Sequence, residues 1–122
     1  MSLLQSERGY GLMYAVNDFE ESQVKLSRTQ RDALMLLVVL ERRGVPMPFP
    51  GPRVLDMVNS DRWTPVARQN FQAGMKTLEA HGLVTISREY GQPLKLTLTD
   101  EGRMHGEVIL SDRTQGDENE RA

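Results

Sequence analysis

Apolar residues recur every three to four positions between Thr64 and Gly82, and this spacing predicts an amphipathic helix over residues 64–81. Thr64 is its expected N-cap, Pro65 its first residue, and Gly82 the left-handed residue that ends it. Amides and bases gather on the outer face, which fits either an ordinary solvated surface or a surface that reads bases in a DNA groove. The expected inward residues are Ala67, Phe71, Gly74, Met75 and Leu78.

A second helix is predicted upstream, from about Arg28 to Arg43. Ser27 and Gln30 have the spacing of a capping box, and Gly44 is the expected stop. The middle of this helix, ALMLLVVL, is apolar on every side. Such a helix is buried on more than one side, so we expect it at the centre of the core or in a subunit interface.

The segment Gly44–Pro52 carries four prolines, which excludes a helix or a central strand. We expect a stiff extended connection whose Met47 and Phe49 plug the core; the alternative is an exposed loop for a partner or ligand. A short helix is predicted next, over Arg53–Asn59, with an inward face of Val54, Leu55 and Val58.

Residues 60–63 would join this short helix tightly to the helix over 64–81, which makes a helix-turn-helix. Trp63, the only tryptophan of the chain, is expected to pack at the turn. A contact of its ring with a nucleic-acid groove is the alternative.

Beyond Gly82 the apolar period changes to two. Alternation over Leu83–Arg88 and again over Leu94–Leu98 predicts an antiparallel β-hairpin that spans residues 83–98. Thr99 is expected to cap a last helix from about Asp100 to Leu110, and the polar residues 111–122 are expected to form a disordered tail.

The composition fits one globular domain, because 39% of the 122 residues are hydrophobic and 26% are charged. There is no cysteine, no secretory pattern and no apolar run of bilayer length, so we expect a cytoplasmic protein without a membrane segment. The net charge is −2, yet residues 25–98 carry eleven bases and six acids. This basic centre is compatible with phosphate binding, and the acidic ends would point elsewhere.

Residues 1–24 are interpreted as an N-terminal extension and a candidate dimerisation element. The apolar part of this extension, GYGLMYAV over residues 9–16, fits either a short helix or a strand. Apolar chain ends of this kind usually dock on the core of their own domain or on a second copy of it.

A helix, a helix-turn-helix and a hairpin follow one another in the order of a winged helix-turn-helix domain. Three stretches of the sequence resemble stretches of MarR-like and PadR-like bacterial regulators. They are LSRTQRDALMLLVVL (26–40), LEAHGLV (78–84) and LTDEG (98–102). The resemblance implies a mainly α fold with a small antiparallel β-hairpin, with residues 25–110 as a winged-helix DNA-binding domain. The proline-rich residues 44–52 stand where those families have a short strand, and no polar constellation specifies a small-molecule effector pocket.

The resemblance also implies roles for individual residues. The recognition helix would turn Pro65, Arg68, Gln69, Gln72 and Lys76 to the major groove, with Gln69 and Gln72 as the expected base readers. Arg62, Thr64 and Asn70 would contact phosphates. The wing would lay Arg88, Gln92 and Lys95 along the minor groove or backbone, with Tyr90 at its tip.

The sequence carries no metal-binding, nucleotide-binding or nucleophile motif. His81 is expected to bind carbonyls at a helix end, and His105 follows Met104 in the last predicted helix without forming a metal-binding motif. We therefore expect neither an enzyme nor a cofactor.

We interpret the chain as a sequence-specific double-stranded DNA-binding regulator, most simply a homodimeric repressor. One alternative is a winged-helix protein–protein adaptor that binds through Met47 and Phe49. Another is a DNA-binding protein of plasmid or mobile-element partition or replication control.

Overall fold

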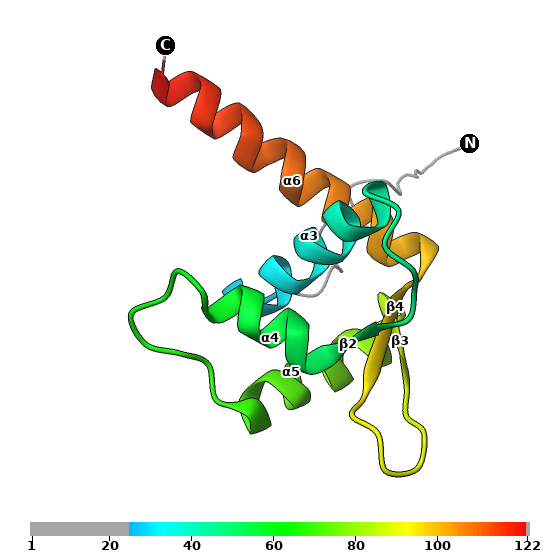
Figure 1. Cartoon of the computed structure of the whole chain (residues 1–122). Coiled ribbons are helices and arrows are strands. Elements are labelled where there is room, and N and C mark those ends of the chain that lie inside the picture. The colour runs from blue at the N-terminus through cyan, green and yellow to red at the C-terminus, as the bar shows by residue number, and fades with distance from the viewer. Residues whose placement is uncertain (1–24, 122) are drawn as a thin grey trace, which may run out of the picture.

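Helix α3 (Arg28–Arg42) runs through the middle of the fold, and the other elements pack around it (Figure 1). The computed structural model describes residues 25–121, so the predictions for residues 1–24, including the apolar segment 9–16, lie outside the described residues. Within this part the mainly α, winged-helix fold class is confirmed. After α3 come β2 (Phe49–Pro50), α4 (Gly51–Asn59), α5 (Arg68–Ala80), β3 (Val84–Ser87), β4 (Lys95–Leu98) and α6 (Asp100–Arg121).

The predicted capping box of α3 is present. The backbone N–H of Gln30 donates to Ser27 Oγ over 3.1 Å, and the backbone N–H of Ser27 donates to Gln30 Oε1 over 2.8 Å. Helix α3 contacts α4, α5, α6 and β4, which confirms that it is the centre of the core. Its fully buried apolar residues are Ala33, Leu34, Leu37 and Val38.

The sheet has three antiparallel strands in the order β2–β4–β3. The predicted hairpin is confirmed, with Val84 opposite Leu98 and Ser87 opposite Lys95. The third strand, β2, was not predicted, because it is only two residues long and lies in the proline-rich segment. Proline is tolerated there because β2 is an edge strand. The expectation that residues 44–52 replace a short strand was therefore wrong.

Phe49 is buried and Met47 is partly buried against the core, so these two side chains do plug the core. The alternative of an exposed partner-binding loop built on them is contradicted. Helix α4 begins at Gly51, before the predicted start at Arg53, with proline in its first turn as helix starts allow.

Helix α5 begins at Arg68, and the predicted start at Thr64 and Pro65 was wrong. The side chain of Asn59 binds the backbone of Val66 twice, accepting from its N–H over 2.8 Å and donating to its carbonyl oxygen over 3.2 Å. This clasp keeps the chain out of the helix as far as Ala67, which is extended. The connection between α4 and α5 is therefore residues 60–67, longer than the tight turn expected from the sequence.

The predicted end of α5 is confirmed. Gly82 has a φ of +77°, its N–H donates to Glu79 O, and the N–H of Leu83 donates to Leu78 O, each over 2.9 Å. This pair of bonds is a Schellman motif, which requires the left-handed conformation that glycine adopts without strain.

Thr99 caps α6 as predicted, because its Oγ1 accepts from the N–H of Gly102 over 3.0 Å. The same hydroxyl donates to Gly82 O over 2.6 Å and so joins the end of α5 to the start of α6. Helix α6 continues to Arg121, so the predicted end at Leu110 and the disordered tail from residue 111 were wrong. A contact beyond Leu110 helps to hold this extra length, since Arg113 donates to Asp32 of α3 over 2.7 Å.

Two glycines on one face of α6 allow it to lie directly on the core. A Cβ at Gly102 would stand 1.8 Å from Leu83 O, and one at Gly106 would stand 2.8 Å from Leu34 O. The Cβ at Gly106 would also stand 2.5 Å from Val38 Cγ2, but the two carbonyl oxygens are backbone atoms, which cannot rotate away as a side chain can. The glycine of the LTDEG phrase is thus explained by packing.

We predict that Gly102→Ala destabilises the protein by about 3 kcal/mol, the upper end of the range typical of overpacking. Gly74→Ala is the matched control, because a Cβ there would stand 3.6 Å from its nearest neighbour, Gln30 Cγ, which is an ordinary contact. Alanine should stabilise that helical position by up to about 1 kcal/mol. Urea unfolding of both variants measures the two changes, and equal stability of the two would contradict this account of α6.

Candidate nucleic-acid interface

The buried ridge of α5 determines which of its side chains face outward. Phe71, Met75 and Leu78 are buried against the core, as predicted. Ala67 was expected inward but is exposed, since it lies at the N-cap. Of the other polar side chains in the first turns of α5, Gln72 is half-buried, and the exposed ones are Arg68, Gln69, Asn70 and Lys76.

Hydrogen bonds from neighbouring elements fix α5 in place. Gln30 of α3 donates its Nε2 to Gly74 O over 3.2 Å, beside the close packing of these two helices. At the other end, Glu79 Oε2 accepts from the N–H of Ile86 in β3 over 3.0 Å. This carboxylate joins the helix to the hairpin, so the position of the outer face of α5 relative to the hairpin is set.

The outer face of α5 meets the start of the hairpin loop in a shallow groove of about 610 Å³. The groove brings together side chains from two segments of the chain, the first turns of α5 and the residue that follows β3. Its lining residues are Ala67, Arg68, Gln69, Gln72 and Arg88. Four of them are predicted DNA-contacting residues, and the structure places these four side by side.

Some cationic side chains are paired with carboxylates. Arg103 of α6 donates to both carboxylate oxygens of Glu41, over 2.8 and 3.0 Å, and Arg42 lies 3.5 Å from Glu107. The first contact lowers the pKa of Glu41 below its usual 4.5. Around the groove, Arg68, Arg88 and Lys76 have no hydrogen bond or ion pair with any described residue. Their charge is therefore left for an external anion.

Arg62, a predicted phosphate contact, is turned into the molecule instead. Its side chain is only 11% exposed, donates Nη1 to Thr29 Oγ1 over 3.0 Å, and donates Nη2 to Asp32. Its buried Nε has no partner among the described residues. The sequence did not reveal this role, because Asp32 and Arg62 are 30 positions apart.

The remaining predicted residues are exposed but differ in position. Thr64 and Pro65 lie in the 60–67 loop, outside the helix assigned to them. Tyr90 and Gln92 are exposed at the hairpin tip, which is closed by a bond from the N–H of Gln92 to Glu89 O. Lys95 lies in the paired part of β4, opposite Ser87, and is half-buried.

Trp63 does not pack at the turn as expected. Its residue exposure is 101%, and among the exposed large hydrophobic residues only Tyr90, at 105%, is comparable. The sequence could not predict this exposure, because the length of the loop depends on the clasp between Asn59 and Val66.

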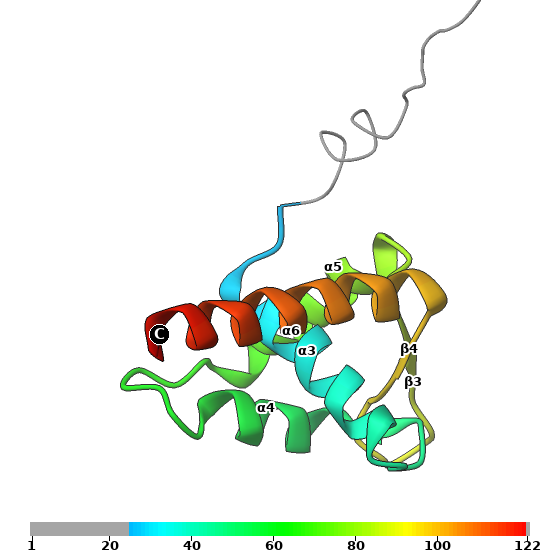
Figure 2. The ribbon, with the colours of Figure 1, turned by 90° about the horizontal axis from the view of Figure 1, so that it is seen from above.

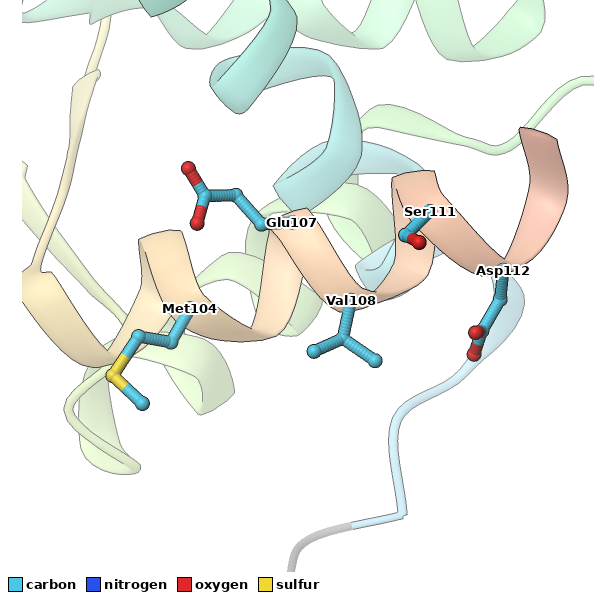
Figure 3. A pocket seen from close by; sticks show the side chains of 5 residues that line it. All are labelled: Met104, Glu107, Val108, Ser111 and Asp112. Atoms are coloured by element: carbon cyan, nitrogen blue, oxygen red, sulfur yellow. The ribbon is translucent and has the colours of Figure 1, made fainter. Parts of the chain in front are cut away.

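A second surface lies on α6, where Met104 and Val108 are 62% and 60% exposed. Figure 3 shows both side chains pointing outward from the helix, with Asp112 one turn further on. They line an open groove of about 510 Å³ together with Glu107 and Ser111. No functional residue was predicted there, although the four-residue spacing of Met104 and Val108 on one helical face was visible in the sequence.

The described residues contain no cluster of three or more His, Cys, Asp or Glu side chains that could hold a metal ion. No helix within residues 25–121 has the length and apolarity needed to cross a membrane.

Comparison with known proteins bears on the fold. No protein-family model matches the sequence, and no curated protein sequence matches it. Among solved structures, the chain is similar to SSV1 F-93, with a TM-score of 0.51 and 18% identity over 72% of this chain and 90% of that chain. At this identity the likeness supports the winged-helix fold, and placement in the MarR-like or PadR-like families stays a prediction.

The Asp32 cluster predicts a pH dependence of stability. Burial raises the pKa of Asp32, but hydrogen bonds from Arg62 and Arg113 and their positive charges outweigh burial, so its pKa lies below the usual 3.8. The unfolded chain therefore takes up the proton first as the pH falls. The stabilisation is complete above the unfolded pKa and is lost as the pH drops through the folded pKa.

We predict that Asp32→Asn lowers the free energy of unfolding by about 2–3 kcal/mol at neutral pH, because two arginines lose a charged acceptor. Unfolding curves between pH 7 and pH 2 should show a smaller acid-induced loss in the variant than in the wild type. A variant that loses stability with acid as steeply as the wild type would contradict the role of this carboxylate.

Proposed function

We propose that this chain is a sequence-specific double-stranded DNA-binding protein that places α5 in the major groove. The observation that carries the proposal is the groove in which Arg68, Gln69, Gln72 and Arg88 meet without internal partners. A helix fits the major groove, where glutamine binds adenine and arginine binds guanine through paired hydrogen bonds. Neighbouring amide and guanidinium groups on one helix can form such paired hydrogen bonds with successive bases.

The hairpin supplies the second contact of the proposed complex. Arg88 lies beside the start of α5, and the exposed tip carries Tyr90 and Gln92. With α5 in the major groove, Arg88 and the tip would reach the adjacent backbone or minor groove. Phosphate contacts of this kind fix the register of a protein on the duplex, while the helix reads the sequence.

We further propose that the protein acts as a homodimeric transcriptional regulator, most simply a repressor that covers a promoter. Two copies would hold two α5 helices one DNA turn apart, about 34 Å, on a near-palindromic site. The exposed Met104 and Val108 on α6 favour self-association, because apolar side chains gathered on one helix face mark contact surfaces. The MarR-like or PadR-like assignment is part of this proposal.

The adaptor alternative is weakened in the form expected from the sequence. It assigned partner binding to Met47 and Phe49, but Phe49 is buried and is covered by Arg53, whose guanidinium lies 5.4 Å from the ring centre. A partner protein would have to use another surface.

We predict that the double change Gln69→Ala and Gln72→Ala flattens sequence preference and leaves binding to random duplex almost unchanged. Each lost amide–base contact should reduce discrimination by about 1–3 kcal/mol. Gel shifts on DNA upstream of the coding region, with random duplex as competitor, measure both quantities.

Arg88→Ala is the matched control for this change. It should weaken binding to all duplexes alike and make the slope of log affinity against log salt shallower by about 0.9, the value of one phosphate contact. Salt-insensitive binding by the wild type, or no binding to any duplex, would refute the DNA-binding proposal.

We predict that Met104→Gln combined with Val108→Gln shifts the protein towards monomer. Both side chains are exposed in the single chain, so the two changes remove apolar contacts from the proposed dimer and none from the monomer. Sedimentation velocity across a concentration series measures the shift, and the thermal transition of the monomer should stay unchanged. A wild-type protein that is monomeric at every concentration would refute the dimer.

A further inference from the structure

Two aromatic side chains, Trp63 and Tyr90, project almost fully into solvent. Single exposed apolar residues are common and need no explanation by themselves. These two differ because each lies on a projection of the fold. Trp63 is in the loop that joins α4 to α5, and Tyr90 is at the tip of the hairpin.

The loop that carries Trp63 is held on both sides of it. Arg62, the preceding residue, is bound to Asp32 and Thr29. Val66, three residues later, is clasped twice by Asn59. Because the residues on both sides of Trp63 are bound in this way, the loop is anchored and its folded backbone exposes Trp63.

The 60–67 loop leads into the start of α5 and the hairpin follows its end, and the two project from different sides of the molecule. In Figure 1 the loop projects at the left and the hairpin at the lower right, and Figure 2 separates them in the same direction. A duplex whose major groove receives α5 has a phosphate backbone on each side of that groove. Each projection would therefore face one of the two backbones.

We propose that Trp63 is a DNA-contacting residue that packs on the sugar–phosphate backbone at the side of the groove away from the hairpin. Indole suits this surface, since its apolar ring covers deoxyribose while Nε1–H donates to a phosphate oxygen. Tyr90 would face the opposite backbone. This inference rests on the proposed DNA binding. It adds Trp63, which was expected to pack at the turn, to the residues proposed to contact DNA.

The charges of the 60–67 loop affect how it would interact with DNA. Asp61 is exposed, while the charge of Arg62 is satisfied internally by Asp32. The loop therefore presents a negative charge beside Trp63, and its attraction for DNA has to come from the indole. An acid so close to phosphate should weaken binding, which makes Asp61 a probe of whether the loop lies near the duplex.

The single tryptophan makes the first test direct, because all indole fluorescence comes from Trp63. We expect a saturating duplex of the DNA upstream of the coding region to reduce the acrylamide quenching constant at least about twofold and to shift the emission to shorter wavelength. An unrelated polyanion such as heparin, at matched charge concentration, controls for loose electrostatic association.

Substitutions give the second test. Trp63→Ala should weaken binding about tenfold, as expected for loss of an aromatic anchor, while Trp63→Phe should lose less. The salt slope should not change, because tryptophan carries no charge. Asp61→Asn should tighten binding about twofold to threefold at low salt, and both Trp63 variants should keep the wild-type thermal transition, since the ring is exposed.

The outcomes separate this inference from the proposed function. Wild-type protein that binds no duplex overturns both. Salt-sensitive binding with an unprotected Trp63 and an unchanged affinity of Trp63→Ala overturns the inference alone. Shielding of Trp63 on concentrating the DNA-free protein would place it between two copies and would likewise overturn it.

Discussion

The structure depends on the burial of the apolar middle of α3. Its apolar centre contacts α4, α5, α6 and β4, so each of these elements buries its own apolar face against the same helix. Close approach is required for this arrangement, and α6 achieves it with Gly102 and Gly106 facing backbone atoms. Polar contacts at the ends of the elements then fix their angles, with Gln30 and Thr99 as the main examples. The outward face of α5 is a result of this packing.

The ion pairs of the molecule join the elements around α3. Three carboxylates pair with arginines of α3, α6 and the 60–67 loop, namely Asp32, Glu41 and Glu107. On the side formed by α5 and the hairpin loop, Arg68 and Arg88 have no such partner among the described residues. A protein with a net charge of −2 can thus carry unpaired cationic side chains on the surface proposed to contact DNA, which the net charge alone conceals.

Local sequence signals predicted the elements whose ends depend on neighbouring residues. The capping box at Ser27, the left-handed Gly82 and the Thr99 cap were all visible, because each bond joins residues close in the chain. Features set by distant residues were missed: β2 needs its partner β4, and α6 extends past Leu110 with a contact from Arg113 to α3. For the same reason Arg62 was assigned to phosphate, although its partner Asp32 lies far away in sequence. Helical periodicity and the family resemblance together singled out Arg68, Gln69, Gln72 and Arg88, the four residues that one groove brings together.

The carboxylate of Asp32 has a structural consequence of its own. One of its oxygens binds Arg113 near the middle of α6, and the other binds Arg62, which starts the path into α5. A displacement of α6 that moved Arg113 away from α3 would leave Asp32 with Arg62 as its remaining close partner. One carboxylate of α3 thus ties α6 to the loop that leads into α5.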